Sequence, residues 1–167
     1  MKQIISLVLA AALLTASLCA CGPDSGGGRD KQVDLAAFAQ TLQESHEFPG
    51  LDRLDPADGE FGAIMLENAY PGLRDMDLEQ AEIYLAKSSF SGVEFALIQA
   101  GNTADAAKVK EIFDARLDSM TTEGQNYPEA VKLWQRSARV VSNGNYVMLV
   151  AHGDSEAIVS EFNALFQ

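Results

Sequence analysis

The chain has 167 residues, of which 24 are acidic and 12 are basic, and its formal net charge is −12. This acidic excess repels a phosphate backbone, so nucleic acid is excluded as an expected partner. An anionic membrane surface also repels such a chain within a Debye length of about 8 Å, so any attachment to a membrane must have another source.

The first twenty residues have the composition of a signal peptide. Lys2 provides a short positive start, and an almost unbroken apolar run follows from Ile4 to Leu18. The run ends in small residues and falls short of the roughly 20 apolar residues that a spanning helix needs. We therefore expect residues 1–20 to be a cleaved signal peptide, the alternative being an uncleaved N-terminal anchor.

Cys21 is expected to carry a lipid. The sequence Leu18-Cys19-Ala20-Cys21 resembles the bacterial lipobox, in which an aliphatic residue and a small residue precede the acceptor cysteine, and Cys19 is the one departure from that pattern. The expected location is therefore the extracytoplasmic face of the cell membrane. Cys19 leaves with the signal peptide and Cys21 becomes a thioether, so disulfides, thiolate nucleophiles and cysteine-bound metals are excluded.

A short linker separates the lipid from the folded part. Residues 21–32 are rich in glycine and have no apolar periodicity, which predicts a lipidated flexible tether with a typical reach of about 18 Å. From Val33 onward the composition is globular, and residues 33–167 fit a single domain. Removal of residues 1–20 takes away one lysine and leaves 147 residues with a net charge of −13.

Two helices and an acidic loop are expected at the start of the domain. An amphipathic helix, capped by Asp34 and stopped by Pro49-Gly50, is indicated by the helical spacing of Leu35, Phe38, Ala39 and Leu42. Residues 51–60 are expected to form an acidic loop. A shorter helix from Glu60 to Asn68 is expected to bury Phe61, Ile64 and Met65.

The rest of the chain predicts four strands and three helices. Strands around 81–87 and 93–99 precede a helix at 103–123, and a short helix at 128–134 follows. Strands at 138–142 and 146–152 precede the last helix at 154–166. Between these two strands, Asn143-Gly144 predicts a two-residue hairpin turn, because a type I′ turn needs positive φ at its central residues.

The order strand, strand, helix occurs twice from residue 81 onward. We interpret it as a weak internal duplication, because the apolar run 93–97 that leads to Gly101 echoes the run 146–150 that leads to Gly153. The predicted fold is α+β: a four-stranded antiparallel sheet from two strand-strand-helix units, with additional N-terminal helices. The helices at 103–123 and 154–166 are expected on one face of the sheet.

From Asp34 to Phe166 the chain resembles a family of small lipoproteins of Gram-positive bacteria known only as a domain of unknown function. The most specific matching stretch is Val141–Val147, and the others are Leu54–Pro56, Tyr84–Ala86, Val93–Ala96, Val109–Arg116 and Tyr127–Glu129. The resemblance implies an extracytoplasmic α+β domain. It implies no activity, cofactor or site residue.

No motif for catalysis or for a cofactor stands out. The only histidines, His46 and His152, are about a hundred residues apart and belong to no HExxH or paired-ligand motif, so no metal site is expected. His46 is expected at the end of a helix, where it complements the helix dipole. The acidic residues between Glu44 and Glu60 indicate a solvated loop, with weak calcium binding as the alternative, since their spacing is not that of an EF-hand.

One face of the predicted sheet, which carries Arg139 at its edge, is otherwise largely apolar. A turn at 143–144 pairs Val140 with Val147 and assigns one face to the core under the two long helices: Ala138, Val140, Val147, Leu149 and Ala151. If Phe95 and Leu97 also point into that core, the second face gains Glu94, Ala96 and Ile98. A solvated face alternates to polar residues. Because this one does not, either segment 34–73 covers it, which we favour, or it binds a partner through Val141, Tyr146, Met148, Val150 and His152.

These observations favour a membrane-anchored, non-enzymatic binding or accessory module that acts on an unknown protein or envelope component. The alternative is a surface hydrolase or carbohydrate-acting enzyme, for which two carboxylates would have to converge in a cleft at about 5–9 Å.

The lipid on Cys21 is directly testable. Cys21→Ser is expected to release the chain from the membrane fraction or to leave the signal peptide uncleaved, because the acceptor thiol is lost. Intact mass spectrometry of the mature wild-type protein checks this. A mature chain that starts at any other residue, or that lacks acyl mass, would contradict the assignment.

Overall fold

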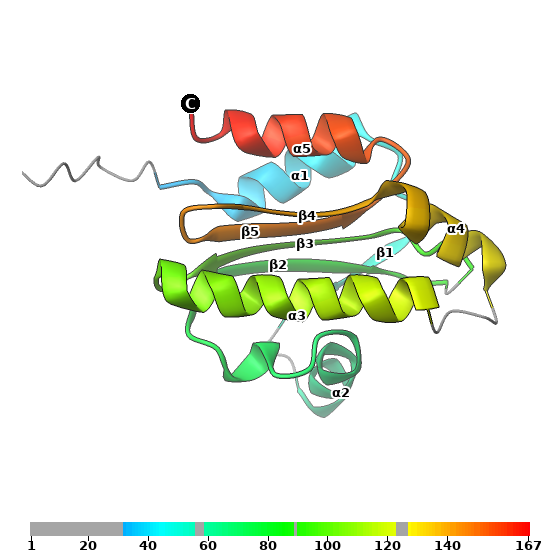
Figure 1. Cartoon of the computed structure of the whole chain (residues 1–167), viewed down its shortest axis with the longest axis horizontal. Coiled ribbons are helices and arrows are strands. Elements are labelled where there is room, and N and C mark those ends of the chain that lie inside the picture. Colours follow the sequence, from blue (N-terminus) through cyan, green and yellow to red (C-terminus); the bar gives the residue numbers. More distant parts are fainter. Residues whose placement is uncertain (1–31, 56–58, 89, 123–126) are drawn as a thin grey trace, which may run out of the picture. The chain divides into compact units, whose positions relative to one another are not determined.

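A five-stranded antiparallel sheet lies at the centre of the fold (Figure 1). The computed structural model describes residues 32–55, 59–88, 90–122 and 127–167. The spatial order of the strands is β1-β2-β3-β5-β4. Their bounds are β1 Leu51–Leu54, β2 Leu78–Ala86, β3 Glu94–Ala100, β4 Ala138–Asn143 and β5 Tyr146–Ala151.

Helices cover both faces of this sheet. Figure 1 shows α1 and α5 on one face and α2 and α3 on the other. The helices are α1 Leu35–Ser45, α2 Glu60–Ala69, α3 Thr103–Thr122, α4 Pro128–Ser137 and α5 Ser155–Ala164, with a 3₁₀ turn η1 at Leu73–Asp75. Across the described ranges, no helix is both long enough and apolar enough to cross a membrane.

The sheet has one strand more than the four predicted. β1 forms in the segment that was expected to be an acidic loop, and it pairs with β2 from Leu51 opposite Ala86 to Leu54 opposite Ile83. Its two leucines pack into the cores on opposite faces of the sheet. Four residues with the order Leu-Asp-Arg-Leu do not show the alternation that marks a strand with one solvated face.

The helices at 103–123 and 154–166 do not share a face, contrary to expectation. α3 packs into a core with Ala96 and Ile98, whereas α5 packs into the opposite core with Met148 and Val150. The physical reason is that both faces of β3 and β5 are apolar, so each face needs its own helical layer. The proposed duplication is therefore not reproduced in space, because its two helices cover opposite faces.

Pairing between β3 and β5 also reverses the expected orientation of β3. Phe95 lies opposite Val150 and Leu97 lies opposite Met148, and residues opposite each other in a ladder point to the same face. Phe95 and Leu97 consequently face α1 and α5, while Ala96 and Ile98 face α3.

The prediction is confirmed for the first N-terminal helix, α1, whereas the second, α2, buries other residues than predicted. α1 is as predicted: the Asp34 side chain accepts a hydrogen bond from the Ala37 backbone at 3.0 Å, and the expected apolar stripe is buried. α2 is rotated relative to expectation, since Phe61 is 76 % exposed and Ile64 53 % exposed. Its core contacts come from a different stripe, Leu66 and Ala69, which leads directly into the buried residues Tyr70 and Leu73.

The last hairpin turns one residue later than predicted. Asn143 pairs with Tyr146, so the turn is Gly144-Asn145, and Val140 lies opposite Leu149. Gly144 has φ +58°, as the first central residue of such a turn requires. Moving the turn by one residue shifts the partner of each β4 residue along β5 by two positions. Because side chains in a strand alternate with a period of two, each residue stays on its predicted face.

The turn predicts a stability effect at Gly144. Gly144→Val is expected to lower the free energy of unfolding by about 1–3 kcal/mol, because a β-branched residue is strained at positive φ. An added Cβ there meets nothing within 4 Å, so the cost is one of backbone conformation and not of a clash. Urea denaturation measures the change.

Gly59→Val is the matched control. Gly59 has φ −55° and equally open surroundings, so this variant is expected to change stability much less. Equal losses in the two variants would contradict the assignment of the turn to Gly144.

Candidate functional site

The face predicted to bind a partner lies inside the fold. Tyr146, Met148, Val150 and His152 are all less than 9 % exposed, and Val141 is half-buried. α1 covers this face with Leu35, Phe38 and Leu42, as favoured from the sequence, and α5 adds Ile158 and Phe162. The coverage removes this face as a docking surface.

A buried carboxylate on the α3 side of the sheet is held by an arginine. Arg116 binds both oxygens of Glu94, at 2.8 Å and 3.2 Å, and the Tyr70 hydroxyl also donates to this carboxylate. The guanidinium lies 5.8 Å from the Tyr70 ring centre and 5.6 Å from the Trp134 ring centre. Burial, and then the charge of Glu94, raises the pKa of Tyr70 well above its usual value. The Glu94 carboxylate therefore accepts hydrogen bonds from both Arg116 and Tyr70.

A second buried carboxylate is held in the same way on the α1 side. Arg53 donates to both oxygens of Glu82, at 2.9 Å and 3.0 Å. Tyr84 donates to Glu82 at 3.2 Å, and burial is the main reason why the pKa of Tyr84 is raised. Glu82 shares its face with Tyr84, whereas Glu94 shares the opposite face with Ala96, so these two acids do not converge.

The two histidines meet at the junction of α1, β5 and α5. His46 is the residue directly after α1, His152 directly follows β5, and Asp154 is the residue before α5. One ligand atom from each of these three residues lies within 4.8 Å of the others. The separation along the chain had suggested no common site, and the fold removes that separation.

Hydrogen bonds fix the orientation of the His152 ring. The Asp154 backbone N–H donates to Nδ1 of His152 at 3.0 Å, so Nδ1 presents its lone pair toward Asp154. Nε2 therefore carries the proton and donates to the Glu47 carbonyl at 2.9 Å.

His46 lies between two carboxylates of the α5 region. Its Nδ1 is 3.3 Å from Oδ2 of Asp154, and its Nε2 is 3.2 Å from Oε1 of Glu161. The same oxygen of Asp154 lies 4.0 Å from Nδ1 of His152. Nδ1 of both histidines thus lies near a single carboxylate oxygen.

Asp154 does not cap α5 in the way that Asp34 caps α1. Asp34 caps its helix with its carboxylate, but the Asp154 side chain makes no capping hydrogen bond and is turned toward His46. The carboxyl end of α1 favours positive charge here and the amino end of α5 opposes it, so the two helix dipoles largely offset each other. Side chains, not helix ends, therefore set the local electrostatics.

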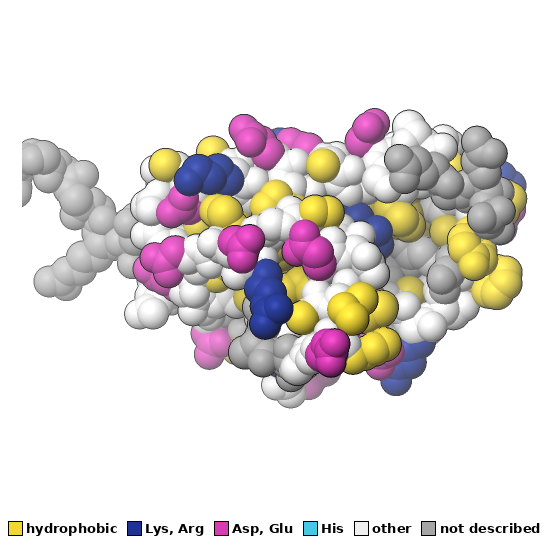
Figure 2. Space-filling model, turned by 90° about the horizontal axis from the view of Figure 1, so that it is seen from below, with side chains coloured by type: hydrophobic (Ala, Val, Ile, Leu, Met, Phe, Trp, Pro, Cys, Tyr) yellow, Lys and Arg dark blue, Asp and Glu magenta, His cyan; other side chains and the backbone are white. Residues whose placement is uncertain are grey.

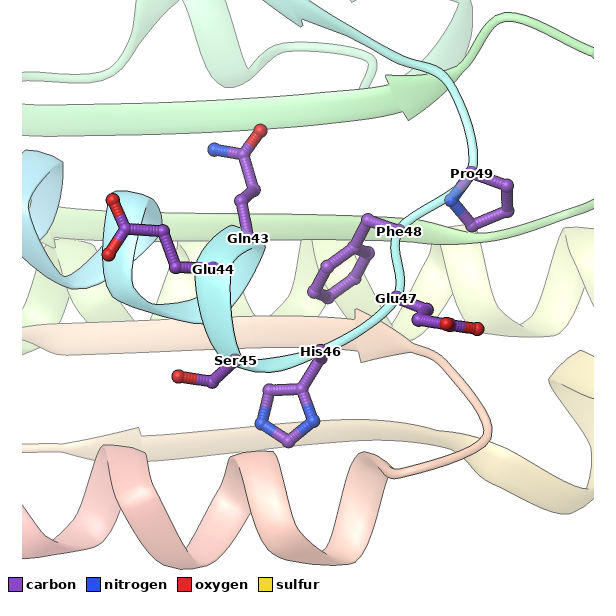
Figure 3. A pocket seen from close by; sticks show the side chains of 7 residues that line it. All are labelled: Gln43, Glu44, Ser45, His46, Glu47, Phe48 and Pro49. Carbon is purple, nitrogen blue, oxygen red and sulfur yellow. The ribbon is translucent and has the colours of Figure 1, made fainter.

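The imidazoles are enclosed while the carboxylates face solvent. Each histidine side chain is 9 % exposed, compared with 61 % for Asp154 and 40 % for Glu161. Phe48 packs against His152, with ring centres 4.5 Å apart. An open pocket of about 600 Å³ lies beside them, lined by Gln43–Pro49, and Figure 3 shows the His46 ring pointing from the end of α1 toward α5.

The other candidates from the sequence are scattered. Asp52 pairs with Lys87 at 3.3 Å and Asp55 with Arg53 at 3.2 Å, while Asp58 lies outside the described residues. Within the described ranges, the histidine cluster is the one group of three or more potential metal-binding side chains. The sequence carried one signal for it that went unused: His152-Gly153-Asp154 places an imidazole and a carboxylate across a tight strand-to-helix turn.

A family model described as a domain of unknown function, DUF4358, matches residues 59–152. Neither a curated protein nor a solved structure matches the chain. The matched segment contains β2 to β5 and ends at His152, so it includes one of the two histidines.

The buried Glu94–Arg116 pair predicts a stability effect. Arg116→Met is expected to lower the free energy of unfolding by about 3–5 kcal/mol, because it leaves the charge of Glu94 buried without a partner. Urea denaturation measures it, with Arg139→Met as the control, since Arg139 pairs with the exposed Glu156 and such a pair contributes about 0–1 kcal/mol. Similar losses in the two variants would show that Glu94 is not effectively buried.

Proposed function

Because the chain belongs to the DUF4358 family, whose description assigns no activity, we propose its role from its own residues: a lipid-anchored, extracytoplasmic binding module. Cys21 holds the domain at the outer face of the membrane of a Gram-positive bacterium, and residues 21–32 provide the tether. The domain binds a protein or another component of the cell envelope, and it does so without catalysis.

The lipid is required for this role because the charge of the chain disfavours contact with the membrane. Its net charge after loss of residues 1–20 is −13, which disfavours adsorption to an anionic leaflet. One acyl chain binds a bilayer only marginally, so a diacylated cysteine supplies the durable attachment.

Binding is favoured over hydrolysis by the placement of the carboxylates. The two beside the pocket, Asp154 and Glu161, are separated by the His46 ring, which contacts both. A glycosidase-type mechanism needs two acids on either side of a single bond. The buried acids Glu82 and Glu94 lie on opposite faces of the sheet, and each is neutralised by an arginine. Two carboxylates with a lowered pKa, Asp105 and Glu129, are hydrogen-bonded to surface lysines.

The observation that carries the proposal is the pocket at the end of α1. There His46, backed by His152 and Asp154, lies beside an opening of about 600 Å³. Enclosed imidazoles next to exposed carboxylates form a polar, oriented surface of the kind that fixes a ligand.

Crosslinking in intact cells tests this proposal. A photoreactive amino acid is placed at Glu44, an exposed residue of the pocket, and in a second strain at Glu111, an exposed glutamate of α3 on the opposite face of the sheet. We expect a defined adduct from position 44 and none from position 111. The adduct should be lost when Cys21→Ser releases the chain from the membrane.

Adducts of equal yield from both positions would indicate non-specific contact and would contradict a binding site in the pocket. An adduct that persists at full yield in a Cys21→Ser strain whose chain has left the membrane fraction would contradict the requirement for the anchor.

A further inference from the structure

The two histidines are oriented alike by their neighbours. Nδ1 of His46 is 3.3 Å from Oδ2 of Asp154, and Nδ1 of His152, which accepts a hydrogen bond from the Asp154 backbone N–H, is 4.0 Å from the same oxygen. Each Nε2 lies on an acceptor, which is the Glu161 carboxylate for His46 and the Glu47 carbonyl for His152. Metal-binding histidines in proteins are oriented in this way, with the second ring nitrogen donating to a carboxylate or a backbone carbonyl. We propose that His46, His152 and Asp154 bind a divalent transition-metal ion of the zinc type, an inference that names the ligand of the proposed binding pocket and so rests on the proposed function.

The distances suit a tetrahedral ion. Zinc with nitrogen and oxygen ligands at about 2.0–2.1 Å separates neighbouring ligand atoms by roughly 3.3 Å. Nδ1 of His46 and Oδ2 of Asp154 are 3.3 Å apart, and Nδ1 of His152 is 4.0 Å from that oxygen. One ligand atom from each of the three residues lies within 4.8 Å of the others, so the site closes around the ion by rotation of the exposed Asp154 carboxylate and by approach of the two imidazoles.

A metal ion also satisfies both contacts of a neutral His46 ring. A neutral imidazole has one N–H, so it donates to only one of the two carboxylates that it contacts. With the ion on Nδ1, the proton lies on Nε2 and donates to Glu161, which gives the carboxylate–histidine–metal arrangement. The ion replaces two hydrogen-bond contacts: that of the Asp154 backbone N–H with Nδ1 of His152, and that of Nδ1 of His46 with Oδ2 of Asp154.

The donor set selects the class of ion. Two imidazoles and one carboxylate suit zinc, copper, nickel or iron, whereas calcium and magnesium require mainly oxygen ligands. Three protein ligands leave one tetrahedral position for a further ligand. An oxygen or nitrogen atom of an envelope ligand fits that position, so the ion links the domain to what it binds.

Titration with zinc alone tests the proposal. The full-length chain, without a polyhistidine tag, is purified in detergent, stripped with a chelator and titrated with ZnCl₂ by calorimetry. We expect one ion per chain and no comparable response to MgCl₂. Because the chain contains only two histidines, nitrogen-15 spectra of the rings should show Nδ1 of both shifting on zinc addition while both Nε2 protons are retained.

Variants assign the ligands. His46→Gln, His152→Gln and Asp154→Asn are each expected to weaken zinc binding at least tenfold. Glu161→Gln is expected to weaken it by about tenfold, because a neutral amide oxygen replaces the charged acceptor of the His46 Nε2–H. Glu156→Gln is the matched control, since Glu156 lies on the same helix, pairs with Arg139 and is expected to leave affinity unchanged. Circular dichroism confirms the fold of each variant, and the exposed Asp154 keeps the test valid if a histidine variant does not fold.

Absence of one-to-one zinc binding at 100-fold excess of metal, or unchanged affinity in the Asp154→Asn and histidine variants, would overturn the metal site. If zinc fails to bind while the crosslink at position 44 persists, the metal inference fails and the binding module stands. If zinc binds but no crosslink forms, the site exists and the proposed function fails.

Discussion

The whole arrangement depends on the burial of β3 and β5 from both sides. Every residue of these two strands is buried, so neither face of this central strand pair faces water. Burial of one large apolar side chain stabilises a fold by about 1.5–3 kcal/mol, and this term favours a helical layer on each face. α3 with α4 supplies one layer, and α1 with α5 supplies the other.

The second layer creates the candidate site. α1 and α5 pack on the same face, and the end of α1 meets the start of α5 above the end of β5 (Figure 1). His46 lies at the first of these points, Asp154 at the second and His152 at the third. The histidine cluster is therefore a consequence of how the chain covers its own sheet, and the enclosing ring of Phe48 completes it.

Among the described residues, two acidic side chains are buried, and the others lie at or near the surface. Glu94 and Glu82 are buried, and each is paired with an arginine from a neighbouring element. Buried ion pairs are roughly neutral for stability relative to apolar residues, so they do not hold the fold together. Figure 2 shows acidic side chains spread among hydrophobic ones on the face seen from below, where they lie in solvent and keep the molecule apart from anionic surfaces.

The sequence allowed much of the local structure to be predicted, since its signals are local. Helix α1 with its Asp34 cap, the strand pairs and the alternation of residues along β5 all follow from periodicity and turn chemistry. β1 and the side on which α5 packs were missed, because both depend on pairing with distant segments. The side of α5 had an indirect signal, the continuous apolar run from Tyr146 to Ala151, which indicates a strand buried on both faces.

The histidine cluster could not be found by spacing, because its members come from three elements that only the second helical layer brings together. The most direct test of this account is a nuclear Overhauser measurement between the rings of His46 and His152, whose centres lie 6.0 Å apart. We predict direct contacts between protons of the two imidazoles and from each imidazole to the ring of Phe48. A His46 ring with no contact to either of these residues would mean that α1 does not cover the second face as described, and the site would not exist.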